Sequence, residues 1–416
     1  MTAKTAIIIG GGIAGCSTAF ALAKRGIAVT LLEQHSELAA EASGNPLAAL
    51  YPKLSIKPTI QSALALKGFA FTLQLLKQLP DSAGFFNACG QIQLAYDARE
   101  QTRQDALIKG IGQDFFQALN KTQASEAAGI ALKKDGLFLP HAGWVKPKEW
   151  CQALVNLPGI TVITQAKVSG IEKNQSCWQV NWGDYPESSE NKKTLQAHDL
   201  KADIVVLCNA NQVNQLYFSS IEMNKQTSSM PVRGQVNFFA PTSVSQAIKT
   251  IICSTHYLSP AVDGLHSIGS TYSDELNPHL NPADTLENLT ALKHISPEIF
   301  NSIQPYKAMG HVAWRSHTQD YLPLAGQLMD EKILRFKPPR YNAHPAELPW
   351  LDGLYVNAGH GSKGMITAPI CGELIANMAC NEALYVESAI ASKLNPSRFL
   401  LRELGLKQLA NTLYSF

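Results

Sequence analysis

The N-terminal segment of the chain limits the possible folds more than any other feature. An apolar, β-branched run at residues 5–9 is followed by the letters GGGIAG, and residues 13–24 then form a predicted helix that ends before Gly26. A second apolar run at residues 27–32 closes with Glu33. This order of strand, glycine-rich turn, helix, strand and acid predicts the βαβ unit of a dinucleotide-binding sheet.

Each glycine in the spacing G-x-G-x-x-G has a physical reason. Gly10 permits a tight turn, Gly12 leaves room for a pyrophosphate against the backbone, and Gly15 lets the helix pack closely on the strand. The N-terminus of the helix directs free N–H groups and a partial positive charge at the phosphates. Glu33 is placed to accept hydrogen bonds from ribose hydroxyls, and an acid at that place disfavours the 2′-phosphate of NADP.

Composition narrows the class of protein. A length of 416 residues suggests two domains, and a content of 45% hydrophobic and 16% charged residues is typical of soluble globular proteins. The net charge of +2 neither requires nor excludes a nucleic-acid partner.

The eight cysteines lack zinc-ligand spacing, so we expect reduced thiols and no metal. The apolar N-terminus resembles an export signal, but its three consecutive glycines argue against export, and we expect a cytoplasmic protein without a membrane span.

The chain after Glu33 departs from the pattern of NAD enzymes, which usually continue directly into further βαβ units. Here a loop of small residues, an amphipathic stretch at 61–79 and a long mixed region intervene. Strands of the first domain return only at 161–180 and at 202–210. Val168 is placed there to offer its backbone to an adenine.

A second glycine-rich turn lies near the C-terminus, within residues 352–379. A strand again precedes it, and we expect Thr367 and Pro369 to open the helix that follows. Two such turns in one chain suggest a single ligand that is held at both ends. The second turn would direct a helix N-terminus and Lys363 at a group that gains negative charge, as the N1 and O2 atoms of a reduced flavin do. The alternative is a surface loop that is rich in glycine.

The loop EASGNPLAALYP at 41–52 is rich in small residues. Small side chains would let its backbone approach the N5 and O4 edge of a flavin, which bulky side chains would prevent. Ser43, Gly44 and Asn45 could serve the phosphates and the ribityl chain, and residues 48–50 would line the ring. Tyr51 would then reach toward the substrate. The full set predicted to bind FAD is Gly10, Gly12, Ile13, Ala14, Gly15, Glu33, Gln34, Ala42, Ser43, Gly44, Asn45, Ala48, Ala49, Leu50, Val168, Ala210, Gly359, His360, Gly361, Ser362, Lys363, Gly364 and Met365.

Four motifs together resemble a known family. They are ASGNPLAALYPKLS (42–55), PVRGQV (231–236), WRSHTQDYLPLAG (314–326) and GHGSKGM (359–365). From about residue 5 to about residue 405 the chain resembles the glycine/D-amino-acid oxidase superfamily of FAD enzymes, and within it the oxidoreductase half of bifunctional enzymes that modify the wobble uridine of tRNA. The resemblance implies an α/β fold with a discontinuous, Rossmann-like FAD-binding domain and an inserted α+β substrate domain on an antiparallel sheet. The implied limits are 1–60, 148–225 and 350–416 for the first domain, and 61–147 and 226–349 for the second.

The resemblance also implies an activity. The carboxymethyl group would be removed from the 5-carboxymethylaminomethyl side chain of uridine in tRNA, which leaves the aminomethyl form. Two positions depart from the family pattern, since Lys363 stands where an arginine is usual and His360 where an apolar residue is usual. The methyltransferase half that normally precedes the oxidoreductase half is also missing, so we expect either a stand-alone enzyme or an excised domain, with a methyltransferase as a possible partner.

An N-alkylated glycine as substrate requires a group that holds its carboxylate. Arg315 is the first candidate because a guanidinium can bind a carboxylate with two hydrogen bonds, and Arg233 is the second, in a positioning role. For both arginines the alternative is a structural ion pair. Tyr51, Tyr257 and Tyr272 could bind the carboxylate or shield the site, although buried structural tyrosines are more common.

Two other functions remain open from the sequence. One is an amine oxidase for a small molecule such as glycine or sarcosine, and the other is a flavin-binding module without turnover. Basic residues could contact RNA, although solvated faces have the same composition, so the tRNA hypothesis depends on the resemblance. These basic residues are Lys332, Arg335, Lys337, Arg340, Arg398, Arg402 and Lys407.

Overall fold

The structure is a computed structural model, and it describes residues 4–110, 115–185, 197–214, 217–218, 229–303 and 308–414. Its first sheet has six strands. In spatial order these are β20 (Leu324–Met329), β21 (Trp350–Ala358), β13 (Ile204–Leu207), β1 (Thr5–Ile9), β2 (Ala28–Leu32) and β9 (Ile160–Ile163).

Five strands of this sheet are parallel, from β21 through β13, β1 and β2 to β9. Only the edge strand β20 is antiparallel to its neighbour. The segment 324–329 falls in the range predicted for the substrate domain, yet it pairs with β21 of this sheet. The exact limits of the two domains stay a prediction, and the α/β class with a Rossmann-like sheet is confirmed.

Alternation along β1 shows how the sheet is covered. Ala6 and Ile8 face a core formed with helices α1 (Ile13–Ala23), α5 (Pro147–Val155) and α9 (Gly364–Ala379). Ile7 and Ile9 face the other way, against a four-stranded sheet that carries the buried Trp178. That sheet consists of β12 (Ala197–Ala202), β11 (Cys177–Asp184), β10 (Ala166–Asn174) and β14 (Tyr217–Phe218).

Helix α9 begins at Gly364, so the prediction that Thr367 and Pro369 open it is wrong. Pro369 lies inside the helix and has no N–H for the carbonyl of Met365. The hydroxyl of Thr72 donates to that carbonyl instead, at 3.2 Å. Thr72 belongs to α2 (Ile60–Gln78), which packs on α9. The internal proline is therefore tolerated because a neighbouring helix supplies the missing donor.

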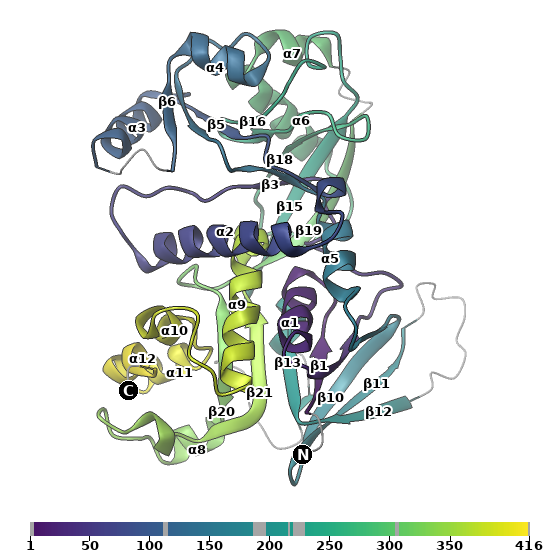
Figure 1. Ribbon diagram of the computed structural model, residues 1–416, viewed down its shortest axis with the longest axis vertical. Helices are drawn as coiled ribbons and strands as arrows, with labels where there is room; N and C mark the ends of the chain where they lie inside the picture. The colour runs from purple at the N-terminus through teal and green to yellow at the C-terminus, as the bar shows by residue number, and fades with distance from the viewer. Residues whose placement is uncertain are drawn as a thin grey trace.

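The second large sheet has eight strands and is mostly antiparallel. Figure 1 shows it in the upper part of the molecule, with the six-stranded sheet below and α2 running between the two. Its order is β19 (Met309–His317), β15 (Met230–Phe239), β18 (His266–Gly269), β17 (Tyr257–Leu258), β16 (Ile251–Cys253), β5 (Gln91–Leu94), β7 (Gly136–Leu139) and β6 (Gln117–Leu119).

Shorter elements complete the fold. A small sheet joins the loop after the first βαβ unit to the second domain, through β3 (Ala48–Leu50), β8 (Gly143–Val145) and β4 (Phe86–Asn87). The remaining helices are α3 (Ala98–Gly110), α4 (Lys121–Ala128), α6 (Pro282–Thr290), α7 (Pro297–Ser302), α8 (Glu331–Phe336), α10 (Ser388–Leu394), α11 (Arg398–Glu403) and α12 (Lys407–Thr412). Within the described ranges, no helix combines the length and the apolar character that crossing a bilayer requires.

Candidate functional site

A cavity of about 810 Å³ lies where the carboxyl ends of the parallel strands meet the second sheet. This is the edge of an open α/β sheet at which ligands bind, and the volume falls in the range of small-molecule and cofactor sites. Both glycine turns line the cavity, although about 350 residues separate them. Strands β15 to β19 and β5 form the opposite wall.

The glycines of the first turn are required by geometry. Gly10 has a φ of 106°, and a Cβ there would lie 2.7 Å from the carbonyl oxygen of Cys208. A Cβ on Gly15 would lie 1.8 Å from the carbonyl oxygen of Gly10, so helix α1 could not approach the turn. Gly12 lines the cavity, and a Cβ on it would point at the hydroxyl of Ser43.

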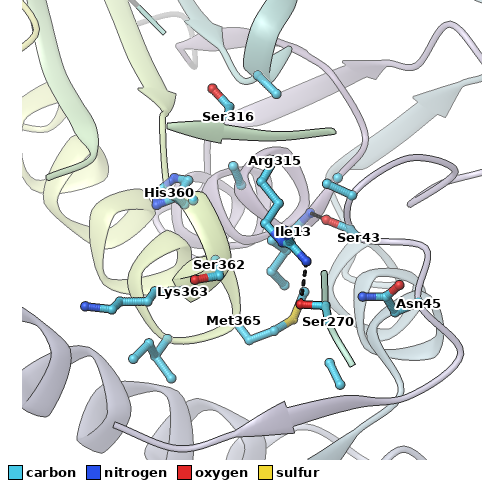
Figure 2. A pocket seen from close by; sticks show the side chains of 18 of the residues that line it. Ile13, Ser43, Asn45, Ser270, Arg315, Ser316, His360, Ser362, Lys363 and Met365 are labelled. Atoms are coloured by element: carbon cyan, nitrogen blue, oxygen red, sulfur yellow. Dashed lines mark hydrogen bonds between the residues drawn. The ribbon is translucent and has the colours of Figure 1, made fainter. Parts of the chain in front are cut away.

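Ser43 stands at the N-terminus of α1. The Ile13 N–H donates to the Ser43 hydroxyl at 3.1 Å, as Figure 2 shows. A hydrogen-bond acceptor therefore already occupies the position where helix dipole and free amides favour negative charge. Nearby, the Glu33 carboxylate accepts from the N–H groups of Gly11 (2.6 Å) and His35 (2.8 Å). Burial raises the pKa of Glu33, and these two hydrogen bonds oppose that shift.

A buried hydrogen-bond network fixes the second turn. The side-chain N–H groups of Asn357 donate to the Thr18 hydroxyl (2.9 Å) and to the carbonyl of Ala14. The side-chain oxygen of Asn357 lies 3.0 Å from Nε2 of His360. Nδ1 of His360 lies 2.9 Å from the Thr367 hydroxyl. Burial lowers the pKa of His360 to about 3, so the ring is neutral. Nε2 donates to the Asn357 oxygen, and the Thr367 hydroxyl, which lies against Nδ1, donates to the carbonyl of Lys363 at 2.9 Å.

Most residues predicted to bind FAD line this one cavity. Three do not, for separate reasons. Gly15 packs against Gly10, Gly44 turns the chain within the loop, where a Cβ would lie 2.6 Å from a carbonyl oxygen, and Leu50 is buried in the core. The residues that do line it are Gly10, Gly12, Ile13, Ala14, Glu33, Gln34, Ala42, Ser43, Asn45, Ala48, Ala49, Val168, Ala210, Gly359, His360, Gly361, Ser362, Lys363, Gly364 and Met365.

Arg315 projects from β19 into the cavity. Its guanidinium donates to the Ser270 hydroxyl (2.6 Å) and to the carbonyl of Thr271 (3.2 Å), and it lies 4.4 Å from the centre of the Tyr272 ring. Burial lowers its pKa, and among the described residues no carboxylate pairs with it. An arginine remains protonated even when it is buried, so Arg315 stays a cation with which the anionic group of a ligand can pair.

Gly234 makes the position of Arg315 possible. Val232 lies opposite Arg315 in the β15–β19 ladder, and Gly234 follows two residues later on the same face. A Cβ on Gly234 would lie 2.2 Å from Nη2 of Arg315 and 2.4 Å from Cζ. The glycine of the PVRGQV motif therefore leaves the space that the guanidinium fills.

Arg233 points to the other face of β15 and does not line the cavity. Its fully buried guanidinium pairs with Asp284 and donates to the carbonyls of Asn277 (2.8 Å) and His279 (2.7 Å). The side chain of Gln235, on the same face, donates to the carbonyl of Asn281 and accepts from its N–H group. This is the ion-pair alternative considered for Arg233, and it fixes the segment that follows Tyr272.

The three predicted tyrosines all line the cavity, in different settings. The neighbouring Cys253 thiol, together with burial, raises the pKa of Tyr51 well above its ordinary value. The Tyr257 hydroxyl bonds with Ser267 (2.9 Å) and donates to the carbonyl of Leu47, and burial raises its pKa to about 12. Tyr272 covers Arg315 with its ring. Tyr51 and Tyr257 are therefore protonated at neutral pH, so they can donate but not act as bases.

Sequence reasoning missed several residues of the cavity wall. His317 lies two residues after Arg315 on the same strand, and strand alternation could have placed it on the same face. Its buried Nε2 has no hydrogen-bond partner among the described residues, and burial, with the charge of Arg315, lowers its pKa. Asn209 follows β13, and its buried Oδ1 likewise meets no donor from the part of the chain that the structure describes. Gln91 and Ser254 reach the cavity only through strand pairing between distant segments, which the sequence does not signal.

The basic residues considered for RNA contact divide into two groups. Arg398 and Arg402 bind the carboxylate of Asp320, and Arg335 pairs with Glu331 and Glu403. These arginines are used within the protein. The others are exposed, and none of them lines the cavity: Lys332, Lys337, Arg340 and Lys407.

Comparison with known proteins identifies the family to which the chain belongs. The profile of the family described as FAD dependent oxidoreductase (DAO) matches residues 5–378. A protein of Methylobacillus flagellatus named tRNA 5-methylaminomethyl-2-thiouridine biosynthesis bifunctional protein MnmC is 38% identical over 99% of this chain. Its namesake in Ectopseudomonas mendocina is 36% identical over 97% of the chain. The chain spans 62% and 60% of the lengths of these two relatives.

Solved structures share the fold at lower sequence identity. Glycine oxidase from Geobacillus kaustophilus has a TM-score of 0.71 and 20% identity, covering 95% of this chain and 99% of its own. Iminodiacetate oxidase from Chelativorans sp. BNC1 has a TM-score of 0.70 and 18% identity, covering 92% of this chain and 97% of its own. At these identities the likeness concerns the arrangement of the chain and not the substrate.

Proposed function

Because this chain belongs to the family of FAD dependent oxidoreductases, we propose that it oxidatively removes the carboxymethyl group from 5-carboxymethylaminomethyluridine, or its 2-thio form, at the wobble position of tRNA. The names of its relatives support tRNA as the substrate, since both refer to the biosynthesis of 5-methylaminomethyl-2-thiouridine. The geometry of the cavity supports the reaction type.

The residues present fit FAD. The cavity joins a phosphate-type turn at Gly10–Ile13 to a second turn at Gly359–Gly364, so a long ligand can contact both. A Cβ at Gly12 would project toward Ser43. Because glycine has no Cβ, this space stays open for a pyrophosphate to approach the backbone. Lys363 lines the same cavity, although Figure 2 shows its side chain extending away from Arg315, and its contact with the ring stays a prediction.

The reaction requires an oxidation followed by a hydrolysis. The substrate group is a secondary amine that carries CH2–COO⁻. Loss of a C–H hydrogen with its electron pair from that CH2, and of a proton from nitrogen, gives a C=N bond. Bound FAD supplies the acceptor for the electron pair. Water then adds to the carbon and the C–N bond breaks, which yields glyoxylate and the primary amine.

One observation carries the assignment of the substrate class, namely the half-buried Arg315 guanidinium without a carboxylate partner among the described residues. The bonds to Ser270 and Thr271 fix the plane of the guanidinium and leave other N–H groups for a ligand. A substrate carboxylate would supply the missing negative charge through two parallel hydrogen bonds. This contact would hold the CH2 group in one orientation in the cavity.

The amine must be neutral before it can be oxidised. His317 lies on the same strand face as Arg315. Its buried Nε2 has no hydrogen-bond partner among the described residues. Burial and the charge of Arg315 lower the pKa of His317, so its ring is neutral at pH 7 and able to accept a proton at Nε2. We assign His317 this role as part of the proposal.

The proposed product needs one further step to become the nucleoside in the relatives' names. An aminomethyl group becomes methylaminomethyl when one methyl group is transferred to its nitrogen. The relatives are named bifunctional, and this chain matches about three-fifths of their length. A methyltransferase, in the same polypeptide or as a partner, is therefore the proposed second activity.

One assay tests the proposed function. Purified holoenzyme is incubated with tRNA that carries 5-carboxymethylaminomethyluridine, and glyoxylate and the modified nucleosides are quantified. We expect one glyoxylate for each aminomethyluridine formed. Turnover of free glycine or sarcosine without turnover of the tRNA would assign the protein to the small-molecule amine oxidases, and a yellow protein that oxidises neither would be a flavin-binding module.

A further inference from the structure

Two tyrosine rings stand in solvent at the cavity. Tyr272 is 59% exposed and Tyr321 is 74% exposed, and both line the cavity wall. Single exposed aromatic residues are common on proteins, but two at the mouth of one functional cavity suggest a surface that contacts a partner.

A fully buried arginine fixes the segment next to each ring. Arg233 is 0% exposed and binds Asp284 together with the carbonyls of Asn277 and His279, in the segment after Tyr272. The backbones of Arg233 and Ser273, the residue after Tyr272, also bond to each other in both directions, at 2.8 and 3.0 Å.

Arg398, also 0% exposed, fixes the residues on both sides of Tyr321. It donates to both oxygens of Asp320 (3.0 and 2.8 Å) and to the carbonyl of Leu322 (2.8 Å), so the residues on both sides of Tyr321 are held. Tyr321 itself has a φ of 56°, a left-handed conformation that is uncommon for a residue with a side chain. The backbone that carries each exposed ring is thus held in place, which reduces the entropy lost on binding.

The two rings flank the substrate-binding part of the cavity. The Tyr272 ring lies 4.4 Å from Cζ of Arg315, and the Tyr321 ring stands nearly perpendicular to His317, with 6.2 Å between centres. Arg315 and His317 are two residues apart on one face of β19. A substrate whose carboxylate reaches Arg315 would therefore bring its adjoining parts to these rings.

Two lysines line the cavity together with the rings, Lys53 and Lys363. Burial and the charge of Lys53 lower the pKa of Lys363. The negative charge of Asp320 is neutralised by Arg398 and Arg402. Neither lysine forms an ion pair within the part of the chain that the structure describes. The two ammonium groups are therefore available to phosphate groups of a ligand.

We propose that Tyr272, Tyr321 and Lys53 form the RNA-contacting rim of the site, where the two rings stack on unpaired bases beside the modified uridine and Lys53 meets a backbone phosphate. The inference depends on the proposed function and names the part of the protein that distinguishes tRNA from a free amine. The wobble uridine lies in a single-stranded loop, and proteins recognise such loops by stacking splayed bases on aromatic side chains.

Tyr321→Ala tests the rim with two substrates of the holoenzyme. The full modified tRNA has neighbouring bases, whereas the nucleoside 5-carboxymethylaminomethyluridine has none. Base stacking is worth about 1–3 kcal/mol per ring, so KM and Kd for the tRNA should rise roughly 5- to 150-fold. The kinetics with the nucleoside should stay within about twofold. Tyr321→Phe keeps the ring and should behave as wild type, as should Tyr341→Ala, which removes a similarly exposed ring away from the cavity.

Lys53→Ala should reduce the slope of log Kd for tRNA against log salt concentration by about 0.7, the value for one phosphate contact with a single strand, and Lys53→Arg should restore it. The proposal is overturned if Tyr321→Ala leaves tRNA binding unchanged, or if it impairs the nucleoside as much as the tRNA. If the wild type does not oxidise the modified tRNA at all, the proposed function fails. The Kd of holoenzyme for tRNA then still decides the role of the ring.

Discussion

The two faces of the β15–β19 strand pair use arginine in opposite ways. On one face, Arg233 meets the carboxylate of Asp284 and two backbone carbonyls, and no part of it reaches the cavity. On the other face, Arg315 meets a hydroxyl, a carbonyl and an aromatic ring in the cavity wall, and no described carboxylate balances it. Arg233 is fully buried, whereas Arg315 is half-buried beside the cavity.

This difference identifies which arginine serves structure and which serves binding. Burying a charge is costly unless it is paired, so a protein keeps an unpaired buried cation where a ligand completes the pair. The same contrast holds for two histidines near the second turn. Both ring nitrogens of His360 are bonded within the protein, whereas Nε2 of His317 has no partner in the described ranges of the chain.

Arg233→Ala gives the largest expected effect on the structural face. It would leave the Asp284 carboxylate with no cation partner, and loss of one partner of a buried pair costs about 3–5 kcal/mol of stability. Thermal or denaturant unfolding measures this loss. Lys67→Ala is the control, because both members of its pair with Glu387 are exposed and its loss should cost less than about 1 kcal/mol. Equal losses for both variants would contradict the distinction between the two faces.

Gly234→Ala tests the cavity face at its tightest point. The new methyl group would occupy the space of the Arg315 guanidinium, whose flexible side chain must then move. We expect kcat/KM to fall roughly tenfold, mainly through KM, with little change in stability or in bound FAD. Gly84→Ala is a suitable control, since a Cβ there meets no atom within 4 Å. Wild-type kinetics for Gly234→Ala would show that the position of the guanidinium is unimportant.

His360 should make stability depend on pH. Its pKa in the folded protein is about 3, below the ordinary value of 6.5, so the unfolded chain takes up the proton first as the pH falls. Stability is therefore lost below pH 6.5, by about 1.4 kcal/mol per pH unit from this group. His360→Gln should lower the slope of unfolding free energy against pH between 5 and 6.5 by close to one proton. An unchanged slope would show that His360 is not the neutral, buried group described above.

The sequence was sufficient to predict the local parts of this account. The first βαβ unit, the second glycine turn and Arg315 are each marked by neighbouring residues, and the structure brings them to one cavity. The partner of Arg233 was out of reach because Asp284 lies 51 residues away, on a helix that packs across the sheet. The start of α9 was misjudged since Thr72, which supplies the donor that Pro369 lacks, belongs to another helix. Gly234 gave no signal either, because its role depends on a side chain of the adjacent strand.

Anaerobic mixing of holoenzyme with tRNA bearing 5-carboxymethylaminomethyluridine tests most directly whether Arg315 binds the substrate carboxylate. Wild type should lose its yellow absorbance as the substrate is oxidised. Arg315→Ala should contain the same amount of FAD but lose colour at least about 30-fold more slowly at limiting tRNA, since truncation of one partner of a charged pair costs 2 kcal/mol or more. Bleaching at the wild-type rate, or loss of FAD together with activity, would contradict the account.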